Sequence, residues 1–317
     1  MFTKIKAGWR QSPHATAVLQ ALFVTFLWST SWVLIKFGLV DIPALTFAGL
    51  RYVLAFLCLL PIFLCSPEAR LLPTLPLVVW LRLSGLGLLL YTVTQGMQFL
   101  GLAYLPAVTV NLMLSLTSVV VALLGILLLA ERPSFKQWLG VLISIGGAFI
   151  YFHPVQIPAG QVVGYAVVMV GVLANGGSAI LGRAINREGA LRPLTVTVVS
   201  MGIGSVILLL VGLLVQGLPV LTWQNWAIIA WLAVVNTAFA FTLWNLTLRT
   251  LSATESSIIN NAMLIQIPIL AVLFLGESIT WRELVGLIVA GIGILLVQLG
   301  RRQKAVQPAA PAHPSQD

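Results

Sequence analysis

The chain has 317 residues, of which 59% are hydrophobic and 8% are charged, and its formal net charge is +9. A soluble domain carries about a quarter charged residues, so this composition excludes a water-soluble fold and indicates an integral membrane protein. The basic residues are scattered singly between apolar runs, which is typical of membrane topology and not of nucleic-acid binding. Cys58 and Cys65 lie in one apolar segment and indicate neither a disulfide framework nor a metal site, so we expect no metal and no cofactor.

Ten apolar runs are long enough to cross a bilayer, whose hydrocarbon core of about 30 Å needs about 20 residues of helix. They occupy residues 17–38, 43–65, 78–100, 106–129, 135–152, 161–182, 194–216, 225–247, 254–275 and 281–299. The first run lacks a small-residue cleavage site, so it is expected to be a membrane span and not a signal peptide. The predicted organisation is a cytoplasmic segment (1–15), two five-helix repeats (16–153 and 160–300) and a disordered cytoplasmic tail (301–317).

The distribution of Lys and Arg predicts the orientation, because cytoplasmic loops carry an excess of both residues. With the N-terminus in the cytoplasm, 14 of the 17 basic residues fall on the cytoplasmic side. The exceptions are Lys36, Arg51 and Arg282. We therefore expect a multi-pass protein of the plasma (inner) membrane with both termini in the cytoplasm.

An internal repeat relates the two halves of the chain. At an offset of 146 residues, LLLAERPSFKQWLGVLISIGG (127–147) aligns with LFLGESITWRELVGLIVAGIG (273–293). Each half then holds five helices, and because five is odd, the second half enters the membrane the opposite way up. Inverted repeats are typical of alternating-access carriers, whose site lies near the midplane between the repeats.

The repeated segment also duplicates a helix–helix turn. Capping boxes are predicted at the starts of the fifth and tenth helices, in the pairs Ser134–Gln137 and Thr280–Glu283. Glu131 and Glu277 end the preceding helices, where we expect a structural role in bonding the backbone donors of those helix starts. Ion coupling is the alternative role for these two glutamates.

The stretch WSTSW (28–32), the doubled L-x-E-x-x-[ST] turn and the two five-helix halves resemble the EamA-type exporters of the drug/metabolite transporter superfamily, over about residues 16–300. The resemblance implies a central cavity lined by the third, fourth, eighth and ninth helices, with contributions from the first and sixth. It also implies export of amino acids and other small metabolites, while relatives move nucleotide sugars or sugar phosphates. Trp28 and Trp32 align with Ala174 and Ser178, so a symmetric aromatic gate is not expected.

Polar residues inside membrane spans face protein or water, so their positions predict a binding site. The third helix, for example, carries Tyr91, Gln95 and Gln98 on one face. The candidate substrate-binding residues are Trp28, Trp32, Tyr91, Gln95, Gln98, Asn111, Ser115, Asn175, Asn236, Trp244, Asn245, Asn260 and Asn261. Amides, hydroxyls and aromatic rings suit a small zwitterionic or moderately polar solute. The alternative is that the hydroxyls bond backbone and the rings pack between helices.

Arg51 lies eight residues into the second predicted helix, at a depth of about 12 Å for 1.5 Å of rise per residue. One hypothesis is that it faces the cavity as the counter-ion of a substrate carboxylate. The alternative is that its long side chain reaches the outer membrane surface or bonds exposed carbonyls.

The predicted spans contain no central carboxylate or histidine, and the chain has no P-loop for ATP. We therefore expect downhill movement or exchange of a small solute. The spans also lack paired His, Asp or Cys residues for metal or nucleophilic chemistry, which argues against an enzyme. A lipid flippase or scramblase, and a nucleotide-sugar or drug carrier, are the alternatives. The expected partners are a small solute and membrane lipid, with the chain as a monomer or homodimer.

Overall fold

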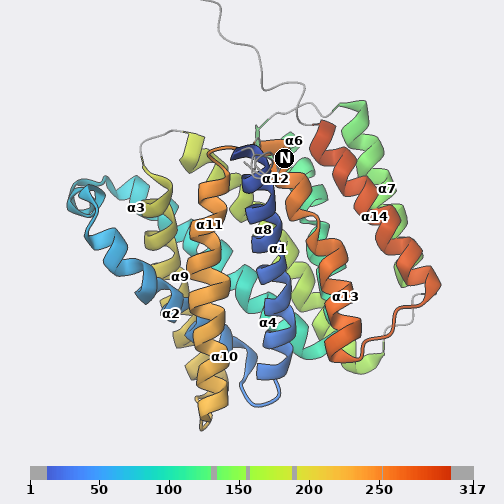
Figure 1. Cartoon of the computed structure of the whole chain (residues 1–317), viewed down its shortest axis with the longest axis horizontal. Helices are drawn as coiled ribbons and strands as arrows, with labels where there is room; N and C mark the ends of the chain where they lie inside the picture. Colours follow the sequence, from blue (N-terminus) through green and yellow to red (C-terminus); the bar gives the residue numbers. More distant parts are fainter. Residues whose placement is uncertain (1–12, 130–133, 155–157, 188–190, 252, 301–317) are drawn as a thin grey trace, which may run out of the picture.

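The computed structural model describes residues 13–129, 134–154, 158–187, 191–251 and 253–300. Within these residues the fold is entirely helical and has ten helices long and apolar enough to cross a membrane (Figure 1). Six spans are single helices: α1 (Pro13–Gly38), α2 (Ala44–Leu64), α7 (Phe135–Phe152), α8 (Val162–Arg187), α9 (Pro193–Gln216) and α14 (Trp281–Gly300). Two short 3₁₀ helices, η1 (Pro67–Thr74) and η3 (Ala159–Gln161), lie in the connections. The predicted all-α membrane fold is confirmed.

The fourth and ninth spans are each broken into two helices, and the regular α-helix of the third and eighth spans is interrupted by a π-helical segment without a gap, whereas the apolar runs predict regular helices throughout. The third comprises α3 (Leu77–Gly87), η2 (Leu88–Thr94) and α4 (Gln95–Tyr104), and the eighth comprises α10 (Trp223–Ala233), η4 (Val234–Phe239) and α11 (Ala240–Thr247). The fourth comprises α5 (Ala107–Ser115) and α6 (Thr117–Leu129), and the ninth comprises α12 (Ala253–Asn260) and α13 (Met263–Leu275).

The interruptions occur at equivalent positions of the two halves. The wide π-helical turns η2 and η4 begin 146 residues apart, and so do α6 and α13, which start directly after the breaks. In each π turn a threonine hydroxyl donates to the carbonyl five residues earlier: Thr94 to Leu89 (2.7 Å) and Thr237 to Leu232 (2.8 Å). Such turns are frequent at functional sites, and here both pairs of interruptions belong to the repeated architecture.

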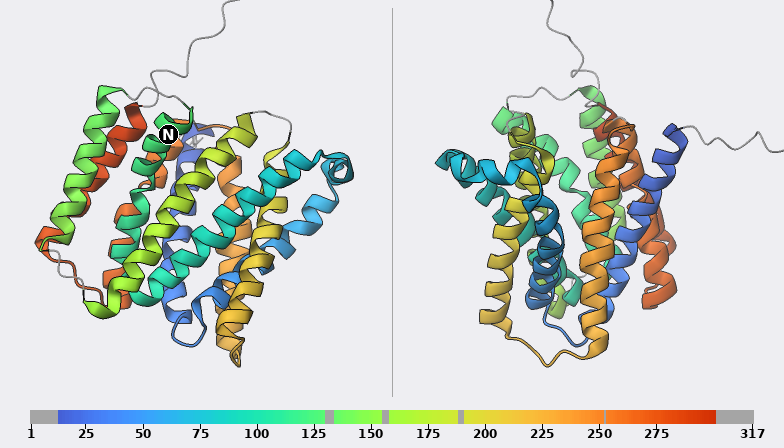
Figure 2. Two further views of the ribbon diagram at one scale, coloured as in Figure 1. Left: turned by 180° about the vertical axis from the view of Figure 1, so that it is seen from behind. Right: turned by 60° about the vertical axis from the view of Figure 1, so that its left-hand side comes forward.

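The helices α7 and α14 show that the two halves are inverted, because they are equivalent in sequence and pack antiparallel. A Cβ atom at Gly140 would lie 2.6 Å from the Gly293 oxygen, and one at Gly286 would lie 2.8 Å from the Gly147 oxygen. The offset of 146 exchanges these two contacts, as a twofold axis between the helices requires. Both glycines let the backbones touch, which is how membrane helices pack without a hydrophobic driving force. Figure 2 shows the pair side by side at one edge of the bundle.

Local signals set the ends of several helices. Pro43 and Pro106 directly precede α2 and α5, where their missing N–H groups are not needed. Gly276 ends α13 in a left-handed conformation (φ +66°) that favours glycine. Both predicted capping boxes are present: the backbone N–H groups of Gln137 and Glu283 donate to the Ser134 and Thr280 hydroxyls, each at 3.3 Å, and the side chains of Gln137 and Glu283 accept in return from the backbone N–H groups of Ser134 and Thr280.

Candidate functional site

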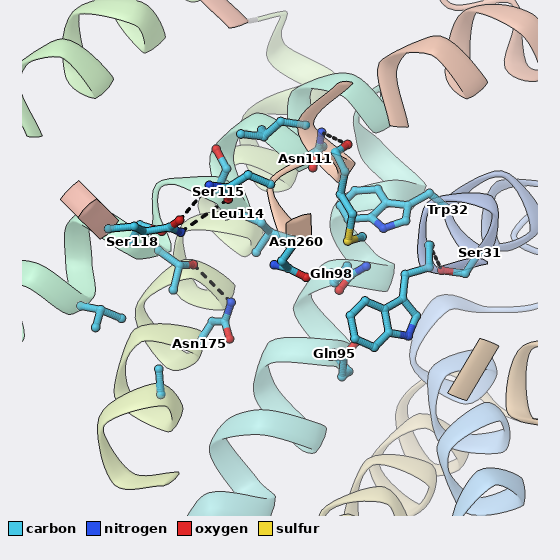
Figure 3. Close-up of a pocket in the computed structure, with 18 of the residues that line it drawn as sticks. Ser31, Trp32, Gln95, Gln98, Asn111, Leu114, Ser115, Ser118, Asn175 and Asn260 are labelled. Atoms are coloured by element: carbon cyan, nitrogen blue, oxygen red, sulfur yellow. Dashed lines mark hydrogen bonds between the residues drawn. The ribbon is translucent and has the colours of Figure 1, made fainter. Parts of the chain in front are cut away.

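A cavity of about 590 Å³ lies among the interrupted spans, with residues from eight of the ten spans in its lining. The lining includes the breaks of the fourth and ninth spans and the first turn of α4, directly after η2. Figure 3 shows Trp32 on one side of the cavity and Ser115 and Asn175 on the other, with Gln98 between them. The repeated interruptions therefore bring side chains of both halves around one space.

Most of the candidate residues meet in this cavity. Its lining contains Trp28, Trp32, Arg51, Gln95, Gln98, Asn111, Ser115, Asn175, Asn260 and Asn261. Ser115 also donates its hydroxyl to the Leu112 carbonyl at 2.6 Å, so that proton is used within its own helix. Contact with a solute stays a prediction for all ten residues.

Hydrogen bonds donated by side-chain amides join the spans around the cavity. Side-chain amides donate from Asn111 to the Met263 carbonyl (3.4 Å), from Asn175 to the Thr117 hydroxyl (3.3 Å) and from Asn261 to the Gln298 amide oxygen (2.8 Å). An amide offers two donors and an oxygen with two lone pairs. Asn111 and Asn175 each use one N–H in these bonds, which leaves further hydrogen-bonding capacity for a solute.

Aromatic side chains form a different part of the lining, where α1 packs against α11. The Trp28 ring centre lies 5.3 Å from that of Phe241 and 5.2 Å from that of Trp244. Phe241 lines the cavity with Trp28, while Trp244 packs behind them and is outside the lining. The cavity thus presents rings on the α1–α11 side, which we call the aromatic wall (Trp28, Trp32 and Phe241).

Among the candidates whose side chains the structure describes, Tyr91, Asn236 and Trp244 do not line the cavity. Asn236 has no exposed surface and donates to the Leu27 carbonyl and, at 3.3 Å, to the Thr30 hydroxyl, so it joins η4 to α1. Tyr91 is buried with its ring centre 5.7 Å from that of Tyr52. Asn245 lies on α11, and its side chain is outside the described residues, as is all of Glu131.

The structure adds lining residues that the sequence did not indicate. Tyr52 on α2 and Gln298 on α14 bring in two spans beyond those implied by the family resemblance. Ser31, Thr117, Arg183 and Ser118, which lies three residues after Ser115, are further polar residues of the lining. Ser31 lies within the WSTSW stretch, which was a usable signal, whereas Gln298 lies near the end of the last apolar run, where a polar residue carries no information about a cavity.

Arg51 is part of this lining and does not reach the outer surface. Its exposed fraction is 5%, and its guanidinium lies 5.1 Å from the Tyr52 ring centre and 5.9 Å from that of Phe99. Its Nε donates to the Thr237 hydroxyl at 3.2 Å, which ties α2 to the π turn η4. The alternative of a side chain extended to the membrane surface is therefore wrong.

Hydrogen bonds join the two halves at the end of the bundle where α5 begins, and we call these contacts the Glu277 closure. Glu277 accepts hydrogen bonds from the backbone amides of Ala107 (2.6 Å) and Val108 (3.1 Å). Lys36 donates to the Leu105 carbonyl at 2.7 Å beside them. We expected Glu277 to cap the tenth helix, and the structure corrects this: the carboxylate reaches across the repeat interface and caps the fourth span instead.

Comparison with protein-family models finds the EamA-like transporter family twice in the chain, at residues 15–152 and 162–299. The two matches cover the two five-helix repeats and almost all of the described spans. They coincide with the halves related by the offset of 146 residues.

Similar proteins are named as transporters. An uncharacterized transporter, YvbV, of Bacillus subtilis (strain 168) is 27% identical over 95% of this chain and 97% of its own length. A probable terminal-alkyne amino-acid exporter of Streptantibioticus cattleyicolor is 26% identical over 92% of this chain and 97% of its own length. A solved crystal structure superposes with a TM-score of 0.63 at 17% identity, covering 92% of this chain and 99% of that chain, which shows a shared fold.

Proposed function

Because the chain belongs to the EamA-like transporter family, we propose that it is an alternating-access carrier that exports small polar metabolites such as amino acids. The observation that carries this proposal is the amide-lined cavity between two inverted halves, bounded by helix breaks at equivalent positions. Discontinuous helices near the midplane are where carriers of this architecture bind their substrates. The name of the Streptantibioticus cattleyicolor relative, a probable amino-acid exporter, supports amino acids as the solute class.

The proposed orientation places both termini in the cytoplasm of a cell with the protein in its plasma membrane. It rests on the excess of Lys and Arg in the connections on that side. In this orientation the part of the cavity near Arg183 and Gln298 faces the cytoplasm, and the Glu277 closure faces outward. The described conformation is then an inward-facing one, ready to take up a solute from the cytoplasm.

The proposed energetics are downhill movement or exchange. Proton-driven carriers generally use Asp, Glu or His inside the membrane. The lining of the cavity in the described part of the chain has none of these residues. Solute flux should therefore persist when no pH gradient is imposed.

The test is transport by the purified full-length chain in liposomes. Radiolabelled amino acids, nucleosides and sugars are loaded inside, and their exit is followed without a pH gradient and with unlabelled solute outside. We expect exit of at least one small polar solute, accelerated by exchange, and no scrambling of a fluorescent lipid. Lipid scrambling without solute flux would contradict the proposal, and flux that strictly requires a pH gradient would contradict its energetics.

A further inference from the structure

The cavity contains a buried cation that the fold itself does not neutralise. Arg51 has a 5% exposed fraction, and among the described residues no carboxylate pairs with it. A charge held inside a membrane protein without a partner is strongly unfavourable, so such residues normally pair or mark a ligand pathway. Thr237 supplies a single hydroxyl acceptor, which does not balance the charge.

The Arg51 guanidinium also has N–H donors that make no hydrogen bond among the described residues. It carries five N–H groups in a planar fork. Its one recorded hydrogen bond uses Nε, so the four N–H groups of the two terminal nitrogens have no acceptor among the described residues. The Thr237 hydroxyl donates a hydrogen bond to the Leu232 carbonyl, and its oxygen accepts the hydrogen bond from the Arg51 Nε. Arg51 is thus a lining residue that is held from its Nε side, while its terminal nitrogens have no acceptor among the described residues.

The remaining lining favours an anion over a cation. It contains amides from both halves, but no Asp or Glu in the described part of the chain. A cationic solute would find only amide oxygens and ring faces, whereas a carboxylate matches a guanidinium with two parallel N–H···O bonds. Such bonds are stronger where the arginine is buried, and Arg51 is buried.

We propose that Arg51 is the specificity-determining residue of this cavity and selects solutes that carry a carboxylate. This inference rests on the proposed transport function and narrows its substrate class. The carboxylate binds at the α2–η4 contact, and the rest of the solute lies between the aromatic wall and the amides of Gln95 and Gln98. A free amino group is not required, because no acidic lining residue in the described chain selects for it.

The test uses matched compounds with and without the carboxylate, applied to the full-length protein in liposomes and in detergent. Two sets serve as probes: phenylalanine, 3-phenylpropionate, phenylalaninamide and phenethylamine, and leucine with its corresponding acid, amide and amine. We expect the amino acids and the plain acids to be transported and to raise the melting temperature. The amides and amines should show at least tenfold weaker competition for transport.

The variants are Arg51→Gln, Arg51→Lys and a control, Arg192→Gln, which removes an exposed cation outside the cavity. Arg51→Gln should weaken carboxylate competition at least tenfold, Arg51→Lys should retain part of it, and the control should match the wild type. If Arg51→Gln does not fold, phenylglyoxal labelling of Arg51 in the wild type provides the second measurement. Carboxylates should slow that labelling, and amides should not.

The outcomes separate this inference from the proposed function. Equal transport of acid and amine, or transport of a nucleoside while all carboxylates are ignored, would overturn the role of Arg51 and leave the carrier assignment intact. If no compound is transported in any assay, both the proposed carrier function and the proposed role of Arg51 are contradicted. Arg51→Gln with unchanged carboxylate competition would also overturn the inference.

Discussion

The two halves of the molecule share a backbone plan, but the side chains that they turn to the cavity differ. The π turns, the helix breaks and the glycine contacts of α7 and α14 all recur at the offset of 146 residues. By the same offset, the contact of α1 with α11 is equivalent to the contact of α8 with α4. Yet the first carries Trp28 against Phe241, and its equivalent carries Ala174 and Gln95.

This difference separates two requirements of a carrier. Alternating access needs two backbones that can exchange conformations, which a symmetric pattern of breaks and close contacts provides. Recognition of one solute needs an asymmetric lining, and the aromatic wall and the amides are our candidates for it. We therefore expect mutations of the shared backbone to affect stability, and mutations of the unequal side chains to affect transport.

The largest expected effect comes from breaking the shared glycine contact. Gly140→Ala places a Cβ 2.6 Å from two backbone atoms of α14, and Gly286→Ala places one 2.6 Å from the Tyr151 nitrogen. Overpacking against backbone should lower the free energy of unfolding by about 1–3 kcal/mol for either variant. Thermal unfolding in detergent measures the loss. Gly146→Ala on the same α7 has no atom within 4 Å of its new Cβ and serves as the matched control. A loss confined to one of the two contact glycines would contradict their equivalence.

A smaller effect is expected at the closed end. Glu277→Gln removes the charge and one of the two acceptor oxygens at the start of α5. The closed conformation should become about 1–2 kcal/mol less stable relative to the open one. The open population should rise about tenfold, since 1.4 kcal/mol corresponds to a factor of ten. The measurement is the labelling rate of Ser31→Cys, in a Cys58→Ser, Cys65→Ser background, by an impermeant maleimide added outside.

Glu283→Gln is the control for that change, because among the described residues the hydrogen bonds of Glu283 go to Thr280 in its own turn. Its labelling rate should match that of the parent. If both substitutions accelerate labelling equally, the bond across the repeat interface is not what closes this end.

The smallest effect tests the unequal side chains. Gln95→Phe gives the first half the residue that the second half has at the equivalent position. Loss of one amide in the cavity should reduce the apparent affinity for the transported solute about fivefold, from about 1 kcal/mol of hydrogen bonding, with little change in stability. Competition assays in liposomes measure this, and Gln95→Asn, which keeps an amide, should lose less. Improved affinity in Gln95→Phe would show that Gln95 does not contact the solute.

The fold was largely predictable because its signals are repetitive and local. Apolar length, the Lys and Arg distribution and the repeated glycines do not depend on tertiary contacts, and they predicted ten spans in two halves. The π turn at 88–94 was not predictable, since LLLYTVT contains no proline or glycine and its wide turn depends on packing and on the Thr94 hydroxyl.

The site was predictable only in part, because a polar residue in a membrane span can satisfy its hydrogen bonds in two ways. Asn111 and Asn236 are both mid-span amides that donate to a backbone carbonyl of another span, yet Asn111 lines the cavity and Asn236 does not. Glu277 likewise bonds to a helix start that is distant in sequence. Which partner is chosen depends on tertiary geometry, and spacing along one helix does not contain that information.

The central claim is that two oppositely oriented halves enclose one cavity. Lys136 and Arg282 test it directly, because both are exposed and occupy equivalent positions at the starts of α7 and α14. Each is changed to cysteine in the Cys58→Ser, Cys65→Ser background and treated in intact cells with an impermeant maleimide. We predict that residue 282 is labelled from outside and residue 136 only after permeabilisation. Labelling of both from the same side would contradict the inverted arrangement.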